Sequence, residues 1–116
     1  MEYRKLGKSD LEISSVGLGC VTFGREIDEE ASSLLMDHAL NNGINILDTA
    51  EAYANGASER VIGNYFQKKK NRDKFILATK KVPSLSYNSV IQGLEASLQR
   101  LQTDHVELYQ LHAYDP

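Results

Sequence analysis

Four polar residues recur at even spacing along this chain, and all four are of types that can move protons. Asp48 and Tyr53 lie in the segment ILDTAEAYANGASE, Lys80 ends the run FILATK, and His112 ends the run ELYQLH. The intervals from Asp48 to Lys80 and from Lys80 to His112 are both 32 residues. Such a spacing predicts one repeated structural unit that delivers each side chain to an equivalent place.

Together these groups are suited to proton donation. A tyrosine hydroxyl has a pKa of about 10, too high to exchange protons readily near neutrality. A lysine ammonium beside it stabilises the phenolate, and a carboxylate such as Asp48 offsets the cost of partly desolvating that lysine. His112 can donate a hydrogen bond to a substrate oxygen. The set suits protonation of a carbonyl oxygen as a hydride reaches the carbon, and that hydride requires a nicotinamide cofactor.

Each residue also has a plainer structural interpretation. Asp48 can cap a local turn, and Tyr53 can be a half-buried aromatic with its hydroxyl in water. Lys80 is followed by Lys81, and one of two adjacent lysines is usually only solvated. His112 can be an ordinary surface histidine. Their common placement at the ends of apolar runs favours the joint chemical interpretation.

Short apolar runs between helical patterns predict the elements that position these residues. A β-hairpin is expected first, from two runs separated by Gly7-Lys8-Ser9-Asp10, at residues 3–6 and 11–13. Four further strands are expected at residues 16–19, 44–47, 75–78 and 106–111. Helices separate these strands, so we expect parallel pairing with right-handed crossovers.

The helices are predicted from caps and from 3.6-residue periodicity. The first helix begins after Asp28 as N-cap, runs to Asn41 and is stopped by Gly43. Its apolar face is expected to carry Leu34, Leu35 and Ala39. The second spans residues 58–69 and is expected to bury Val61, Ile62, Tyr65 and Phe66. The third presents one face with Ile91, Leu94, Leu98 and Leu101.

The resulting fold class is α/β: a β-hairpin followed by βαβαβαβ. A (β/α)8 barrel of roughly 250 residues spends about 31 residues on each unit, so this order predicts a partial TIM barrel. Residues 1–116 would form a single domain, with helices on one face of the sheet and the other face bare. The alternative is a small doubly wound sheet, which needs helices on both sides. In a partial barrel both edge strands also lack partners.

Composition narrows the class of protein. The chain has 116 residues and a net charge of −3, so no basic balance favours nucleic acid or an anionic membrane. No signal peptide or membrane-spanning run is visible, and Cys20 is the only cysteine, so a cytoplasmic protein without an internal disulfide is expected. The three histidines do not show metal-ligand spacing, so no metal is expected.

The motifs resemble the N-terminal part of the aldo-keto reductase family. The similar segments are YRKLGKSDLEISSVGLGCVTFG, GINILDTAEAYANGASERVIG, FILATK and LYQLHAYDP, in the family's order. The resemblance implies a (β/α)8 barrel that reduces aldehydes and ketones with NADPH. It also implies Tyr53 as proton donor, Lys80 as the neighbour that eases its loss of the proton, Asp48 as partner of Lys80, and His112 as the donor that orients the substrate.

The resemblance also implies cofactor contacts and a missing part. Thr22 and Phe23, after the first strand, correspond to a segment that approaches the cofactor, and Asp48 lies beside it. Strands five to eight of the family carry most NADPH contacts and are absent here, so the chain alone is expected to bind NADPH weakly and to be inactive. The alternative is a non-enzymatic half-barrel that associates with itself through the uncovered sheet face, or with a partner chain. A Schiff-base aldolase using Lys80 is a further alternative.

Overall fold

A computed structural model describes residues 1–115 of the chain. It opens with an antiparallel hairpin of β1 (Tyr3–Lys5) and β2 (Glu12–Ser14). Strands and helices then alternate: β3 (Leu18–Gly19), α1 (Glu29–Asn41), β4 (Ile46–Asp48), α2 (Ala57–Lys69), β5 (Ile76–Lys81), α3 (Tyr87–Leu101) and β6 (Leu108–Leu111). Short 3-10 turns lie at Tyr53–Gly56 and Arg72–Lys74. The predicted order of elements is confirmed.

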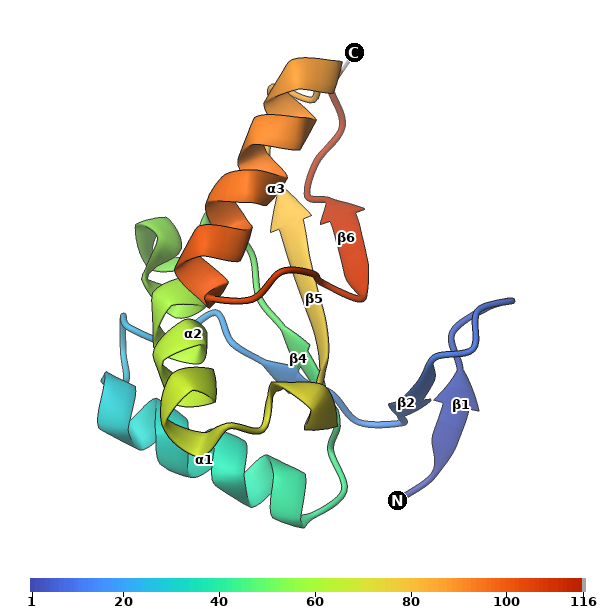
Figure 1. The fold of residues 1–116 in the computed structure, drawn as a ribbon, viewed down its shortest axis with the longest axis vertical. Coiled ribbons are helices and arrows are strands. Elements are labelled where there is room, and N and C mark those ends of the chain that lie inside the picture. The colour runs from blue at the N-terminus through green and yellow to red at the C-terminus, as the bar shows by residue number, and fades with distance from the viewer. Residues whose placement is uncertain (116) are drawn as a thin grey trace.

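The last four strands form one parallel sheet in the order β3-β4-β5-β6. The three helices all lie on one side of this sheet, and the hairpin stands apart from them (Figure 1). The core fills the space between helices and sheet. Its fully buried members are Cys20, Phe23, Met36, Leu47, Ile62, Leu77 and Leu101. This one-sided covering matches the partial barrel and not the doubly wound alternative.

The opposite face of the sheet has no helix on it among the described residues. Ile46, Ala78, Leu108 and Gln110 line a shallow pocket of about 270 Å³ there, together with residues 13–15 of the hairpin. Side chains alternate between the two faces of a strand, so Asp48 and Lys80 lie on this uncovered face too.

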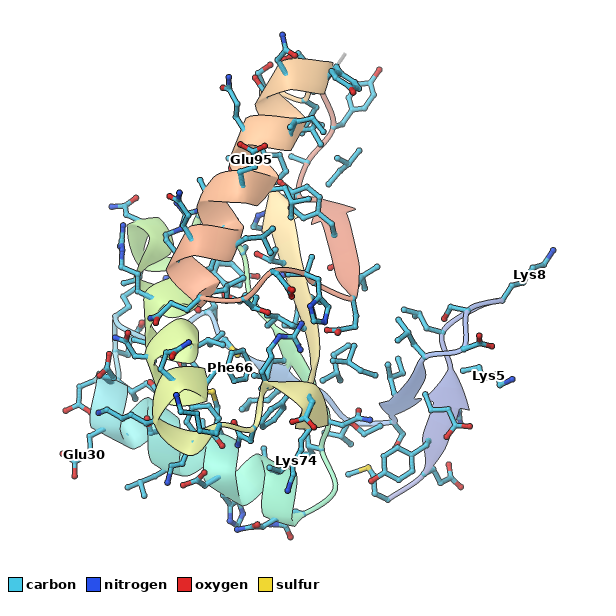
Figure 2. All side chains as sticks on the ribbon, viewed as in Figure 1. Lys5, Lys8, Glu30, Phe66, Lys74 and Glu95 are labelled. Carbon is cyan, nitrogen blue, oxygen red and sulfur yellow. The ribbon has the colours of Figure 1, made fainter. Side chains whose placement is uncertain are left out.

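Side chains explain why the hairpin is anchored although it stands apart. Asn45, just before β4, accepts the Ser14 N–H at 2.8 Å and donates to the Glu12 carbonyl at 2.9 Å. The Tyr3 hydroxyl donates to the Gly43 carbonyl at 2.8 Å. Lys5 and Lys8 point away from the rest of the molecule (Figure 2). One polar side of the hairpin is therefore tied to the start of β4, and the other faces solvent.

Two of the predicted apolar helix faces are only partly buried. In α1, Leu34 and Leu35 are 64% and 42% exposed, whereas Met36 and Ala39 are buried. In α3, Ile91 is 42% exposed and Leu101 is buried. The α2 prediction is confirmed, since its four expected apolar residues are all buried. Helical periodicity identifies which residues share a face, but α1 and α3 lie at the two ends of the helical layer, where only one flank has a neighbour (Figure 1).

The boundaries of α1 follow the predicted caps, and α3 has an N-cap that was not predicted. The Asp28 carboxylate accepts the Ala31 N–H at 2.9 Å, and Ser86 caps α3 by accepting the Ser89 N–H at 3.3 Å. Gly43 follows α1 with a φ of +83°, a conformation that glycine adopts without strain. Within residues 1–115, no helix combines the length and the apolar character needed to cross a bilayer.

Candidate active site

The carboxyl ends of the parallel strands bring the predicted residues to one edge of the sheet. Asp48 ends β4, Lys80 is the penultimate residue of β5, and His112 follows β6. The His112 N–H donates to the Lys81 carbonyl at 2.8 Å, which continues the β5–β6 pairing past the end of β6. Each site residue lies two positions beyond the partner of the preceding one, since Asp48 pairs with Ala78 and Lys80 with Gln110. All three still lie at the carboxyl edge of the sheet, because each βα unit returns the chain to that edge.

The Lys80 ammonium lies at the centre of this group. Its Nζ donates to Asp48 Oδ1 at 2.6 Å, to the Thr49 carbonyl at 2.8 Å and to the Tyr53 hydroxyl at 3.2 Å. An ammonium has three N–H donors, so each is matched by one acceptor. The Lys80 nitrogen is also 4.8 Å from the centre of the Tyr53 ring. The ammonium is therefore held in a fixed position against the phenol.

The surroundings keep Lys80 protonated. Partial burial alone would lower the pKa of its ammonium, but the hydrogen bonds to Asp48 and Tyr53 and the charge of Asp48 outweigh that effect and raise the pKa. The Lys80 side chain is 14% exposed, whereas that of Asp48 is 49% exposed. A permanent positive charge consequently faces the Tyr53 oxygen at neutral pH.

His112 contacts the site through its ring. The His112 and Tyr53 rings meet edge to face, with centroids 5.7 Å apart and planes at 86°. His112 Nδ1 is buried without a hydrogen-bond partner among the described residues. The structure therefore brings together all four residues named from the sequence, three by hydrogen bonds and the fourth by an aromatic contact.

The loop between β4 and α2 presents Tyr53 through an unusual turn. Ala54, Asn55 and Gly56 have φ values of +52°, +54° and +91°. Left-handed backbone costs a non-glycine residue about 1 kcal/mol, so other contacts must hold this loop in place. The Glu51 N–H donates to the Lys80 carbonyl at 3.2 Å, and the Tyr53 N–H to the Ala50 carbonyl at 3.2 Å.

Thr22 and Phe23 differ in what they can offer a cofactor. Phe23 is fully buried in the core, so its side chain is not open to a ligand in this structure. Thr22 is half-buried, and its carbonyl accepts the N–H groups of Arg25 and Ile27 at 3.1 and 3.2 Å. A cofactor contact from this segment stays a prediction, carried by Thr22 and by main-chain groups.

Sequence reasoning missed two buried charges next to the site. Of the adjacent Lys80 and Lys81, one was expected to be solvated, but Lys81 too is only 8% exposed and pairs with Glu51. Glu59 of α2 is fully buried and binds Thr79 and Arg100. Strand alternation was a signal for Lys81, because that residue shares the helix-covered face of β5 with the buried Leu77 and Thr79.

A shallow pocket on the uncovered face meets the candidate site only at Asp48. The pocket on the uncovered face, which includes Asp48 at its rim, has a volume of about 270 Å³. Sites for cofactors and drug-sized ligands usually measure about 300–1,000 Å³ and bury most of the ligand. Tyr53, Lys80 and His112 do not line this pocket, so it does not enclose a dinucleotide against them.

Comparison with known proteins gives a consistent family. The model of the aldo/keto reductase family matches residues 15–116. The protein named uncharacterized oxidoreductase YrpG, from Bacillus subtilis (strain 168), is 41% identical over 133 residues, covering 99% of this chain and 41% of YrpG. The chain thus spans about two fifths of the length of the curated relatives it matches.

Solved structures agree with this match. Aldo-keto reductase AKR11C1 from Bacillus halodurans, in its holo form, is 36% identical with a TM-score of 0.85, covering 99% of this chain and 41% of that protein. An aldo-keto reductase from Klebsiella pneumoniae in complex with NADPH is 29% identical with a TM-score of 0.82, covering 90% of this chain and 37% of that one.

Proposed function

The chain belongs to the aldo/keto reductase family, and from that premise we propose that it supplies the proton-transferring part of a reductase that converts an aldehyde or ketone to an alcohol with NADPH. Its four parallel strands are part of a (β/α)8 barrel. We propose that residues 1–116 are the N-terminal half of that barrel. The observation that carries the proposal is the Lys80 ammonium, which contacts both the Tyr53 hydroxyl and Asp48.

Tyr53 is the proposed proton donor. As negative charge develops on the substrate carbonyl oxygen, the phenol gives up its proton to that oxygen. The resulting phenolate faces the Lys80 ammonium at 3.2 Å, and this charge contact stabilises the phenolate. Asp48 balances the lysine charge and fixes its position at 2.6 Å. General acid catalysis of this kind contributes about 10²–10⁴-fold to the rate.

His112 is the proposed substrate-orienting residue. Its ring stands edge-on to Tyr53, so an oxygen that contacts the phenol also lies within reach of the imidazole. A hydrogen bond from the imidazole would hold the carbonyl oxygen and stabilise its developing charge. A bound nicotinamide would supply the hydride, and Asp48, Tyr53 and Thr22 are the residues that would meet that end of the cofactor.

The test adds the length that the relatives have and this chain lacks. We suggest joining residues 1–116 to the part of YrpG that the chain does not match, and following NADPH oxidation with a panel of aldehydes and ketones. We expect turnover, and a loss of about 10²–10⁴-fold in kcat on Tyr53→Phe. Tyr87→Phe is the matched control, since Tyr87 is 82% exposed. A Tyr53→Phe protein as active as its parent would refute the proposed role.

The chain by itself is expected to bind NADPH weakly, because the pocket beside Asp48 has a volume of only about 270 Å³ and is not lined by Tyr53, Lys80 or His112. A titration of nicotinamide fluorescence checks this, and submicromolar binding by residues 1–116 would contradict it.

Self-association is the second candidate, favoured by the uncovered sheet face with Ile46 and Leu108 along its pocket. Two copies that pair edge to edge in a C2 arrangement would contribute four strands each and would cover the exposed sheet face of each copy. Light scattering over a range of concentrations tests this candidate, and a well-folded monomer at micromolar concentration excludes it.

A further inference from the structure

An enclosed ion pair lies behind the candidate site, on the helix-covered face of the sheet. Lys81 Nζ is 3.3 Å from Glu51 Oε2, and the two side chains are only 10% and 15% exposed. The same Glu51 oxygen accepts the Val82 N–H at 3.1 Å, and Lys81 Nζ also donates to the Val82 carbonyl at 2.6 Å. Both charges are therefore bound on several sides, away from solvent.

The α3 helix is shaped to admit this lysine. A Cβ atom at Gly93 would lie 2.5 Å from Lys81 Cδ and 2.6 Å from Cε, so any larger residue would displace the side chain. Glycine in the middle of a helix costs about 1 kcal/mol relative to alanine, so its presence here calls for a reason. The path of Lys81 towards Glu51 supplies one.

Residue 81 connects the segments that carry the proposed catalytic groups. Glu51 lies two residues before Tyr53, on the loop with the left-handed turn. The Lys81 carbonyl accepts the His112 N–H at 2.8 Å, and Lys80 is the preceding residue of β5. The side chain of Lys81 thus contacts the Tyr53 loop, and its main chain contacts the His112 segment.

We propose that Lys81 and Glu51 are positioning residues, whose ion pair fixes the Tyr53 loop to the end of β5 and so sets the contact of Tyr53 with Lys80 and His112. Stability alone is a weak reason for such a pair, because apolar residues of similar volume are often as stable or more so. In contrast to an apolar contact, the Lys81–Glu51 ion pair and its hydrogen bonds are directional, so they specify one position of the Tyr53 loop. The inference takes its functional meaning from the proposed role of Tyr53, but its test does not depend on activity.

The experiment compares three variants of the 116-residue chain with the parent. Lys81→Met keeps the apolar stem beside Gly93 and removes the charge. Glu51→Gln keeps an oxygen acceptor for the Val82 N–H but weakens the ion pair. It allows the proposal to be tested even if the Lys81→Met chain does not fold. Lys74→Met is the matched control, because Lys74 is exposed and points away from the sheet (Figure 2).

Two readouts separate positioning from general stability. The first is amide hydrogen exchange, followed at residues 49–56 and Val82 and, for comparison, in the core segment 61–66. The second is the ¹H NMR shift of the His112 ring protons, which the edge contact with Tyr53 displaces.

We expect Lys81→Met and Glu51→Gln to speed exchange in the loop at least tenfold, to leave the core segment unchanged, and to move the His112 signals towards those of a free histidine. Lys74→Met should change neither readout. Unchanged loop exchange and His112 shifts would overturn the proposal. So would an equal loss of protection in loop and core, since that is the signature of a purely stabilising pair. The 116-residue chain could give the expected exchange rates and His112 shifts while its chimera with YrpG is inactive. That result would refute the proposed function and leave the positioning role of Lys81 and Glu51 intact.

Discussion

Removing Arg100 should destabilise the fold by leaving Glu59 as an uncompensated buried charge. The Glu59 side chain is fully buried, and its two oxygens are bound by Arg100 Nε and by the Thr79 hydroxyl, both at 2.7 Å. Arg100→Met keeps much of the apolar length of the side chain and deletes the charge. Breaking a buried ion pair on one side costs about 3–5 kcal/mol. Because the Arg100 side chain is 22% exposed, we expect the lower end, about 3 kcal/mol.

Replacing both charges should recover most of that loss. In the double variant Glu59→Met and Arg100→Met, neither charge of this pair remains. The Thr79 hydroxyl loses its acceptor, and the buried Ser97 hydroxyl loses the donor that Arg100 supplied. An unpaired buried hydroxyl costs about 1–3 kcal/mol, and apolar packing of the two methionines offsets part of it. The double variant is therefore expected to be more stable than the Arg100→Met single variant.

Urea unfolding followed by circular dichroism measures these differences. With a slope of about 1–3 kcal/mol per molar urea, a loss of about 3 kcal/mol lowers the midpoint by roughly 1–3 M. Arg60→Met on the exposed side of α2 is the control and should change stability by less than about 0.5 kcal/mol. If the Arg100→Met chain is unfolded even without urea, whereas the double variant is folded, the result agrees with the reasoning. A single-variant loss below about 1 kcal/mol, or a double variant less stable than the single, refutes it.

Two further predictions follow from the pKa shifts. Burial raises the pKa of the Cys20 thiol to about 12, so a disulfide reagent at pH 8 should modify Cys20 only as fast as the chain opens, and rapid labelling of folded protein would contradict its burial. The pKa of Lys80 is raised in the folded chain, so its contribution to stability is complete below the unfolded value of about 10.5 and is lost as the pH rises through the folded value. Urea midpoints measured from pH 9 to 12 should thus fall more for the parent than for Lys80→Met, and parallel curves would show that the lysine contacts add nothing to stability.

The even spacing of Asp48, Lys80 and His112 made the candidate site predictable. It reflects the length of one βα unit, and parallel strands convert that length into a shared edge. Residue types then indicated the contacts, and the Lys80 contacts with Asp48 and Tyr53 have the expected geometry. The roles in catalysis are not given by that geometry and stay proposals.

The burial of individual side chains was harder to predict, because it depends on which elements pack around a helix or strand, and local sequence patterns do not contain that information. Leu34 and Leu35 lie on a regular apolar face, but nothing in the described chain covers that flank of α1. Lys81 and Glu59 were missed for the opposite reason: their charges suggest solvent, whereas partners distant in sequence hold them in the interior. A buried charge becomes predictable only when its partner is known.

The sheet order also affects how this protein behaves at high concentration. The outermost strand β6 reads LYQL, with neither a lysine nor a proline to discourage recruitment of another backbone, and Gln110 and Leu111 are exposed. Its outward N–H and C=O groups are a template for strand addition. Pairing of a strand from a second folded molecule with β6 is therefore the route by which we expect this protein to associate in a concentrated solution.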